Sequence, residues 1–386
     1  MRKLSWKVPL QLLLISAFLI GLGTTTIRAQ GTAQLSSFKF ADDNQIALQK
    51  AWTTYRLALD KHRDGKDLEA VDALKRTIIL NPRFAEAYNT LCVVYDSLSR
   101  RDEAITSCQQ AIAAKSDFAA AFYNLGLVFD AAERPAEAIA ALRHVLVLEP
   151  SHPEALYHLG QLYDRTRSYE LAQQTLKRAI EMRPEYAAAY NELGFSYCAV
   201  GRFEEAIAAF QQAVATTPGE AHFQGNLGTA HYLAGHYAEA IASLSQAINT
   251  QPGLQIAQNN LGEVYLKTSH YLEAIDCFRR AINLGSDQSE FQPGIYNDLA
   301  AAYVHLAKYK KASELLAKAI QLKPDFRTAI FNLGVVDLIL NDKAGAFHQY
   351  VALKALDPEL AAKLYARISA SRLIQVKPAE QVNESP

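Results

Sequence analysis

A sequence pattern with a period of 34 residues recurs along most of this 386-residue chain. It is clearest in residues 187–218, AAAYNELGFSYCAVGRFEEAIAAFQQAVATTP. When the copies are aligned, one position is always Leu, as in Leu193, and the next is small, as in Gly194. A second position is always Ala, at Ala70, Ala104, Ala138, Ala172, Ala206, Ala240, Ala274, Ala312 and Ala346. Self-similarity at a fixed period indicates a repeat architecture.

Each copy contains two helical patterns. In the central copy, apolar residues follow a 3.6-residue period first around residues 190–197 and then around 206–214. Several copies place between the two patterns a residue that tolerates the left-handed conformation, namely Gly65, Gly201, Gly235 or Asn341. Most copies end at a Pro, which cannot continue a helix. A single helix pair cannot bury its apolar face, so we predict an all-α fold of stacked pairs.

The repeated residues resemble the tetratricopeptide repeat. The positions that carry the resemblance in the central copy are Tyr190, Leu193, Gly194, Tyr197, Ala206, Phe210, Ala213 and Pro218. The resemblance implies a right-handed α-solenoid of nine helix-turn-helix repeats over residues 46–358, with a concave groove lined by the first helix of each repeat. Four extra residues enter near 285–292, residues 359–374 read as a capping helix, and residues 375–386 as a disordered tail.

The N-terminus has a different character. Arg2, Lys3 and Lys7 precede an apolar run over residues 8–23, and Ala29 follows as a small residue. This order is typical of a secretory signal peptide, so we predict that residues 1–29 are removed and that 30–45 form a linker. The alternative is an uncleaved membrane anchor over residues 8–23. Both interpretations place the repeats outside the cytoplasm, in the periplasm or secreted.

Four cysteines occur in the repeats. Cys92 takes the small position of its first helix, and Cys108 faces it from the second helix of the same repeat. An exported compartment permits a disulfide between them. The other interpretation, which the pattern slightly favours, is a pair of small buried apolar residues. Cys198 and Cys277 lie in different repeats and are predicted to be unpaired.

Polar residues recur at equivalent positions of the predicted first helices. Directly before the constant Leu stand Asn124, Asn226, Asn260 and Asn332, with His158, Thr90, Glu192 and Asp298 in the same place in other repeats. One residue earlier come Asn89, Asn191, Asn259 and Asn297. An Asn side chain both donates and accepts hydrogen bonds, so it can pair with a peptide group in either direction. We therefore predict that this Asn ladder binds the backbone of an extended peptide. The alternative is a set of solvated polar positions.

Other candidate contacts follow the same first helices. Three successive repeats carry Asp96, Asp130 and Asp164 at one position, and Tyr123, Tyr157 and Phe195 offer shallow aromatic contacts. The Asn ladder is similar to that of the superhelical repeat domain of O-linked N-acetylglucosamine transferase, which holds extended peptides. The likeness concerns the groove only, because no transferase domain follows. The four positions without Asn depart from that pattern and interrupt the ladder.

The predicted function is non-catalytic. No nucleophile, phosphate-loop or metal-ligand motif occurs, and the densest group of His residues, His222, His231 and His236, lacks metal-site spacing, so we expect neither enzymatic activity nor a cofactor. The formal net charge of −1 gives no basic footprint for nucleic acid. We predict a scaffold that binds an extended peptide or partner protein in its groove. The alternative is a structural component of a cell-envelope assembly that docks through its convex or terminal faces.

Overall fold

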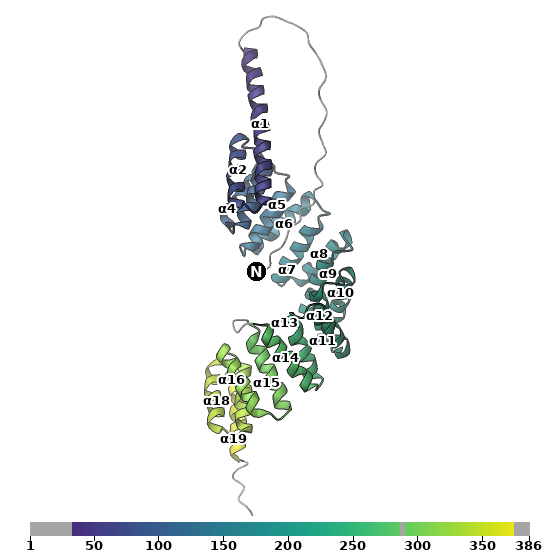
Figure 1. Cartoon of the computed structure of the whole chain (residues 1–386), viewed down its shortest axis with the longest axis vertical. Coiled ribbons are helices and arrows are strands. Elements are labelled where there is room, and N and C mark those ends of the chain that lie inside the picture. Colours follow the sequence, from purple (N-terminus) through teal and green to yellow (C-terminus); the bar gives the residue numbers. More distant parts are fainter. Residues whose placement is uncertain (1–32, 286–289, 374–386) are drawn as a thin grey trace, which may run out of the picture. The chain divides into compact units, whose positions relative to one another are not determined.

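The computed structural model describes residues 33–285 and 290–373 (Figure 1). Within these ranges every regular element is an α-helix, and short turns join consecutive helices on each side of the gap at residues 286–289. The helices are α1 Ala33–Arg63, α2 Asp67–Leu80, α3 Ala85–Ser97, α4 Arg101–Ala114, α5 Ala119–Ala131, α6 Pro135–Leu148, α7 Pro153–Arg165, α8 Tyr169–Met182, α9 Ala187–Ala199, α10 Phe203–Thr216, α11 Ala221–Ala234, α12 Tyr237–Thr250, α13 Gln255–Lys267, α14 Tyr271–Leu284, α15 Gln292–His305, α16 Tyr309–Leu322, α17 Arg327–Ile339, α18 Lys343–Leu356 and α19 Pro358–Leu373. The helices α1 to α18 form nine pairs, as the repeat pattern predicts.

Two compact units divide the chain after Ala87. In the first unit α1 packs against α2, and an aromatic cluster closes the end of the pair. The rings of Trp52 and Tyr55 lie 4.6 and 5.0 Å from the ring of Phe84, measured between centroids. The second unit begins within α3 and contains all the later helices.

The predicted linker over residues 30–45 is wrong for the part that the structure describes. Helix α1 already begins at Ala33 and runs for 31 residues to Arg63. The segment lacks Gly and Pro after Gly31, so nothing in it breaks a helix, and its polar composition alone suggested a linker. Residues 1–29, with the predicted signal peptide, and the tail 375–386 lie outside the described residues. None of the described helices has the length and apolar character that a membrane crossing requires.

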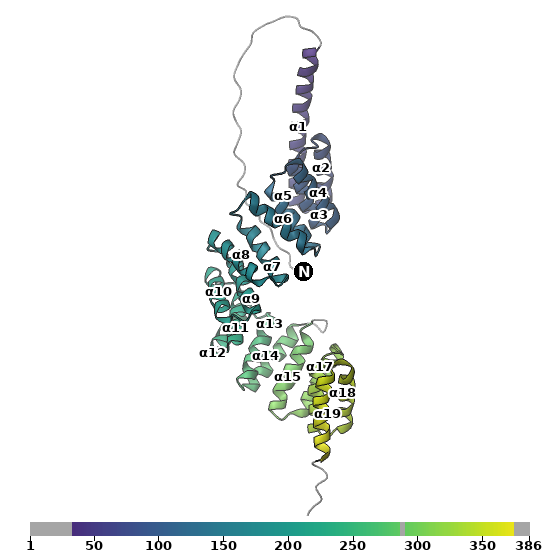
Figure 2. The same cartoon turned by 180° about the vertical axis from the view of Figure 1, so that it is seen from behind.

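Helix pairs in the second unit stack in chain order (Figures 1 and 2). From α4 onward each helix contacts the next, so every pair packs against the following one. First helices also meet across repeats, since α7 contacts α9, α9 contacts α11, α11 contacts α13 and α13 contacts α15. The second unit is therefore an all-α solenoid in which each repeat buries apolar surface against its neighbours.

The small residue after the constant Leu sets how closely the two helices of a repeat approach. A Cβ atom added at Gly160 would lie 2.6 Å from the Leu176 side chain, and one at Gly194 would lie 2.6 Å from the Phe210 ring. Both of these larger side chains are fully buried. The second helix thus places a bulky apolar side chain directly on the backbone of the first helix, which explains why the first helix needs Gly, Ala or Cys there.

The turn inside each repeat has one residue in the left-handed region. Gly65, Gly201, Gly235 and Asn341 adopt positive φ, as their residue types predict. In the other repeats the same place is taken by residues that rarely adopt this conformation and that the sequence pattern did not predict: Ser99, Glu133, Arg167, Ser269 and Ala307. A left-handed residue with a Cβ costs roughly 1–2 kcal/mol. The turn geometry is therefore imposed by the packing of the two helices rather than by a local glycine.

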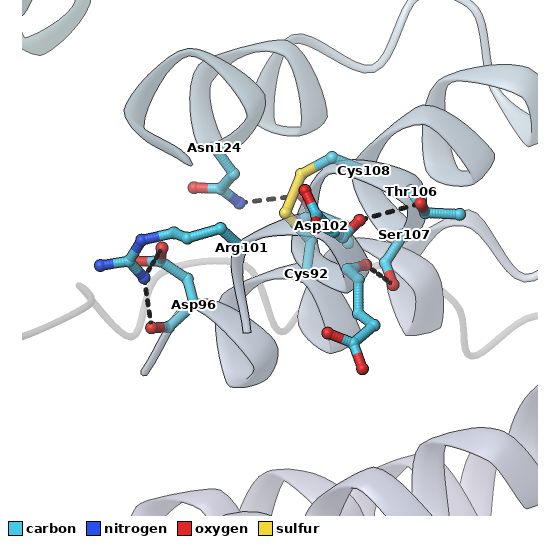
Figure 3. Close-up of a disulfide and its surroundings, with 10 residues drawn as sticks. Cys92, Asp96, Arg101, Asp102, Thr106, Ser107, Cys108 and Asn124 are labelled. Carbon is cyan, nitrogen blue, oxygen red and sulfur yellow. Dashed lines mark hydrogen bonds and ion pairs between the residues drawn. A yellow bond between two sulfur atoms is a disulfide. The ribbon is translucent and has the colours of Figure 1, made fainter. Parts of the chain in front are cut away.

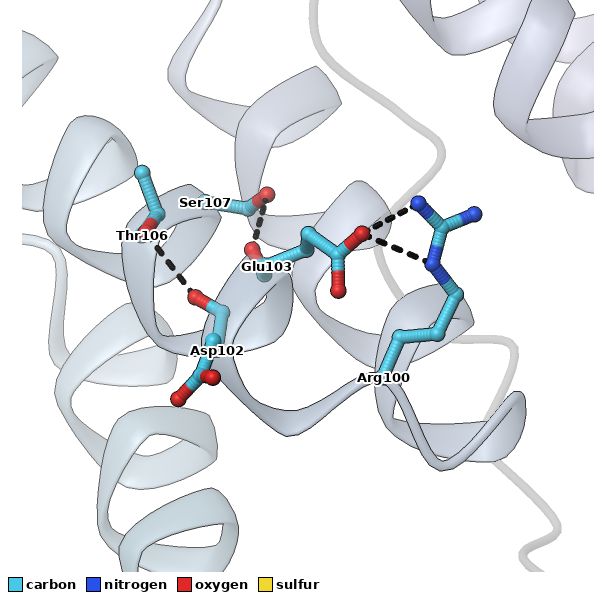
Figure 4. A network of polar contacts seen from close by, with 5 residues as sticks. All are labelled: Arg100, Asp102, Glu103, Thr106 and Ser107. Carbon is cyan, nitrogen blue, oxygen red and sulfur yellow. Dashed lines mark hydrogen bonds and ion pairs between the residues drawn. The ribbon is translucent and has the colours of Figure 1, made fainter.

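An arginine recurs directly after this turn, at the start of the second helix. Arg100 donates from Nε to Glu103 Oε1 at 2.9 Å (Figure 4). Its guanidinium also lies 4.7 Å from the centroid of the Tyr95 ring. Arg134 with Glu137, and Arg202 with Glu205, repeat the ion pair. These pairs are well exposed, so each contributes little to stability.

The last helix closes the solenoid. Leu364 and Ile368 of α19 are buried against α17 and α18, together with Leu353. The bounds of α19, Pro358–Leu373, match the predicted capping helix within one residue. Without this helix the apolar face of the final repeat would be exposed to water.

Candidate functional site

The candidate site is the first-helix face, which we define as the solvent side of the odd-numbered helices α3 to α17 in the second unit. These helices carry both predicted ladders. Because the repeats are in register, equivalent residues of neighbouring first helices lie side by side, and their side chains meet across the junction between repeats.

Asn side chains of neighbouring repeats bond to one another. Asn226 of α11 donates from Nδ2 to Oδ1 of Asn191 of α9 at 2.8 Å. The same contact joins Asn124 to Asn89 and Asn332 to Asn297, each at 2.9 Å. In each pair the residue directly before Leu donates to the residue two before Leu in the preceding repeat. The Asn ladder thus forms hydrogen bonds between neighbouring repeats. Only the remaining donor and acceptor capacity of each amide is available to a ligand. Its contact with a bound peptide stays a prediction.

The hydrogen-bond pattern of the ladder differs at Asn259 and Asn260. Asn260 donates from Nδ2 to Thr229 Oγ1 at 2.8 Å, and Asn259 donates from Nδ2 to Glu263 Oε1 at 2.7 Å. The Oδ1 atom of Asn259 is buried and has no hydrogen-bond partner among the described residues. This repeat therefore leaves an unused acceptor on the first-helix face.

The Asn pairing gives a testable coupling. We expect Asn191→Ala and Asn226→Ala to lower the free energy of unfolding by about 1 kcal/mol each, because each leaves a half-buried amide without its partner. The double variant should cost less than the sum of the two, with a coupling of about 1 kcal/mol in a urea-unfolding cycle. Asn124→Ala combined with Asn226→Ala serves as the control, since these residues belong to different pairs. Additivity in both cycles would contradict the pairing.

The three equivalent Asp residues differ in their surroundings. Asp96 accepts from Arg101 Nη1 at 2.6 Å, and Asp130 pairs with Arg165. Neither carboxylate oxygen of Asp164 has a hydrogen-bond partner among the described residues. Burial raises the pKa of Asp164 to about 6. Two of the three therefore have internal partners, and the third carries an uncompensated charge at neutral pH.

That uncompensated charge predicts a pH-dependent effect. An acid whose pKa is raised on folding favours the folded state below its unfolded pKa and loses this contribution as the pH rises through about 6. Asp164→Asn should therefore stabilise the protein at pH 7.5, by on the order of 1 kcal/mol for a half-buried, partly screened group. The gain should shrink below pH 6 and vanish near pH 4. Asp130→Asn, which loses an ion pair, is the control. A gain that is constant with pH would contradict the assignment.

The aromatic residues predicted to contact a partner pack largely against other side chains of the protein. The Tyr123 ring stacks on His152 at 5.1 Å, and burial raises the pKa of its hydroxyl group. His158 contacts Gln161 through Nδ1 at 3.2 Å, and burial lowers the pKa of its imidazole. Phe195 is half-exposed and meets the Phe210 ring edge-to-face at 5.3 Å. Of the predicted aromatic contacts, Phe195 presents its side chain to solvent most openly.

A cavity that the sequence did not reveal opens on the same face. It has a volume of about 410 Å³ and is lined by residues of α13 and α15 and by the turn that precedes α17. Ile256, Phe291 and Phe326 supply apolar walls, and carboxylates come from Glu263, Asp298 and Glu290, which precedes α15. The one sequence signal was the insertion near 285–292, because Phe291 lies in that segment; residues 286–289 themselves lie outside the described ranges.

A disulfide joins the two helices of the second repeat (Figure 3). Cys92 of α3 and Cys108 of α4 are both fully buried, and their Cα atoms are 5.3 Å apart. The structure thus has the bond rather than the two unbonded thiols that the pattern slightly favoured, because the constant tight approach of the helices brings the two side chains face to face. Cys198 and Cys277 are free, and burial raises the pKa of each thiol to about 11.

Comparison with known families identifies the repeat. Two sequence profiles, both described as tetratricopeptide repeat, match residues 185–252 and 253–325 in one case and 93–153 and 123–187 in the other. Together they span more than half of the chain. The chain is a tetratricopeptide repeat protein. Repeats of this family typically form non-catalytic scaffolds for protein interaction. No curated protein matches the whole sequence significantly.

This tetratricopeptide repeat protein is similar to several solved structures. A tetratricopeptide repeat protein from Parabacteroides merdae is similar over 66% of this chain and 99% of its own, with 18% identity and a TM-score of 0.51. YrrB, described as having an unusual peptide-binding site, matches 48% of this chain and 96% of its own at 24% identity and a TM-score of 0.43. PilF from Pseudomonas aeruginosa matches 56% and 97% at 21% identity and a TM-score of 0.48.

Proposed function

We propose that this protein is a non-catalytic scaffold that binds an extended polypeptide along its first-helix face, outside the cytoplasm. The observation that carries the proposal is the cavity of about 410 Å³ between neighbouring first helices. Ile256 and Phe291 at its walls are each 57% exposed, so apolar surface is left open beside buried polar groups. A cavity with apolar walls and a few convergent polar groups is the usual form of a binding site.

An extended strand suits this surface. Neighbouring helices lie about 8–10 Å apart, and an extended chain advances about 3.3 Å per residue, so each repeat meets about three residues of the strand. The partly used Asn amides line the same face in several of the repeats. Binding by several weak backbone contacts, with one side chain held in the cavity, follows from this spacing.

A selection from a displayed library of random 12-residue peptides tests the proposal on the purified full chain. Selected peptides should bind at least tenfold more weakly to the double variant Ile256→Ala/Phe291→Ala, which removes the exposed apolar walls. The control is Leu272→Ala/Phe347→Ala, which removes exposed apolar groups of second helices α14 and α18. If no peptide is enriched, or only the control weakens binding, the first-helix face is not the binding surface and docking through the other faces is favoured.

Two features support export. The first 29 residues have the order of a signal peptide, and disulfides such as Cys92–Cys108 persist in oxidising compartments. Mass spectrometry of the protein from its producing cells should find an N-terminus at Gln30. A chain that retains residues 1–29 would contradict cleavage and favour the membrane anchor.

A further inference from the structure

The cavity on the first-helix face contains more hydrogen-bond acceptors than donors. Glu263 accepts from Asn259 Nδ2 at 2.7 Å, and Asp298 accepts from Asn297 Nδ2 at 3.1 Å. Neither carboxylate forms an ion pair with a described Lys, Arg or His residue. The two carboxylates therefore face one space with few donors of the protein to satisfy them.

The two carboxylates affect each other. Burial and, to a smaller extent, the negative charge of Glu263 raise the pKa of Asp298 to about 6. Burial also raises the pKa of Glu263. Two acidic groups that share a partly buried space without a counter-ion cost stability, and a cation between them would offset that cost. The cavity thus favours a positively charged occupant.

Other groups of the cavity narrow the choice of cation. Lys323 also lines it, but its Nζ atom lies over the Phe326 ring, 5.8 Å from the centroid, and forms no ion pair with either carboxylate. Ile256 and Phe326 line the cavity with apolar groups. A guanidinium group combines five donors, no acceptor and a flat surface that stacks on aromatic rings.

We propose that this cavity holds a basic side chain, arginine in preference to lysine, from the extended polypeptide. This inference rests on the proposed function and adds which kind of side chain the bound polypeptide must present. Glu263 and Asp298 would accept hydrogen bonds from the guanidinium, and the apolar side chains that line the cavity would contact its flat faces. The volume of about 410 Å³ accommodates such a side chain with part of the strand.

The test uses a peptide from the displayed library and its synthetic analogues. We expect the enriched peptides to share a basic residue at one position. Replacing that residue by citrulline, which keeps the shape and removes the charge, should weaken binding to the purified protein by about 30-fold or more. The double variant Glu263→Gln/Asp298→Asn should bind the arginine peptide and the citrulline peptide equally. A lysine analogue should bind with intermediate affinity.

A control variant and the possible outcomes distinguish a failure of this inference from a failure of the proposed function. Glu273→Gln/Asp276→Asn makes the same change of charge on exposed residues of α14, the second helix of the same repeat, and should keep the preference for arginine. Enriched peptides that need Ile256 and Phe291 but bind equally well with citrulline would overturn the inference and leave the proposed function intact. If no peptide is enriched, the proposed function fails. Thermal melting should show the Glu263→Gln/Asp298→Asn variant to be at least as stable as the wild type at pH 7.5, since it removes uncompensated charge.

Discussion

Leu176→Ala is expected to lower the free energy of unfolding by about 2–5 kcal/mol. Leu176 is fully buried in α8 and lies against Gly160, at the closest approach of the two helices of its repeat. Its side chain also belongs to the core shared with the following repeat, which includes Leu193 and Phe210. Truncation therefore leaves a cavity between the two helices of the repeat.

Urea unfolding followed by circular dichroism measures this effect. Leu171→Ala is the matched control, because it removes the same atoms from the same helix at a position that is 48% exposed. The control should change stability by about 0.5 kcal/mol or less. Equal losses at the two positions would contradict the proposed packing of the repeat.

Removal of the disulfide has the second-largest expected effect. Cys92 and Cys108 are 16 residues apart in sequence, and closing a loop of that size stabilises a protein by about 3 kcal/mol in the chain-entropy account. The double variant Cys92→Ala/Cys108→Ala should therefore lose about 2–4 kcal/mol. Alanine fits both places, because equivalent positions in other repeats hold small or apolar residues.

Melting with and without a reducing agent distinguishes the covalent bond from packing. The wild-type protein should unfold at a lower temperature once reduced, whereas the double variant should not respond to the reducing agent. Cys277→Ala, which removes a free buried thiol, is the control. Its melting temperature should fall on reduction by as much as that of the wild type. A wild-type melting temperature that is insensitive to reduction would mean that Cys92 and Cys108 carry free thiols.

The fold was predictable from the sequence because each copy of the repeat packs in the same way, so equivalent residues have the same role in every copy. The constant Ala206 and the small Gly194 report directly on the close approach of helices, and both are buried where the pattern requires it. The extent of α1 was not predictable, since polar residues without Gly or Pro are compatible with a helix or a linker. The left-handed turns at Glu133 and Arg167 also had no local signal, because tertiary packing imposes them.

The candidate site was predictable only in part. The sequence located the Asn ladder, but it could not show that Asn226 and Asn191 would bond to each other, because that depends on the stagger between neighbouring first helices. The cavity was missed for a similar reason. Glu263 and Phe291 belong to different repeats and occupy positions that do not recur, so no periodic signal connects them.

Site-specific photo-crosslinking in the producing cells tests the central claim most directly. One photoreactive residue would replace Ile256 on the first-helix face, and another would replace Leu272 on α14, the second helix of the same repeat; both side chains are exposed, at 57% and 64%. The account predicts a discrete polypeptide adduct from position 256 and none from position 272, and the adduct should be lost when Phe291 is changed to Ala. An adduct from position 272 alone would contradict binding on the first-helix face.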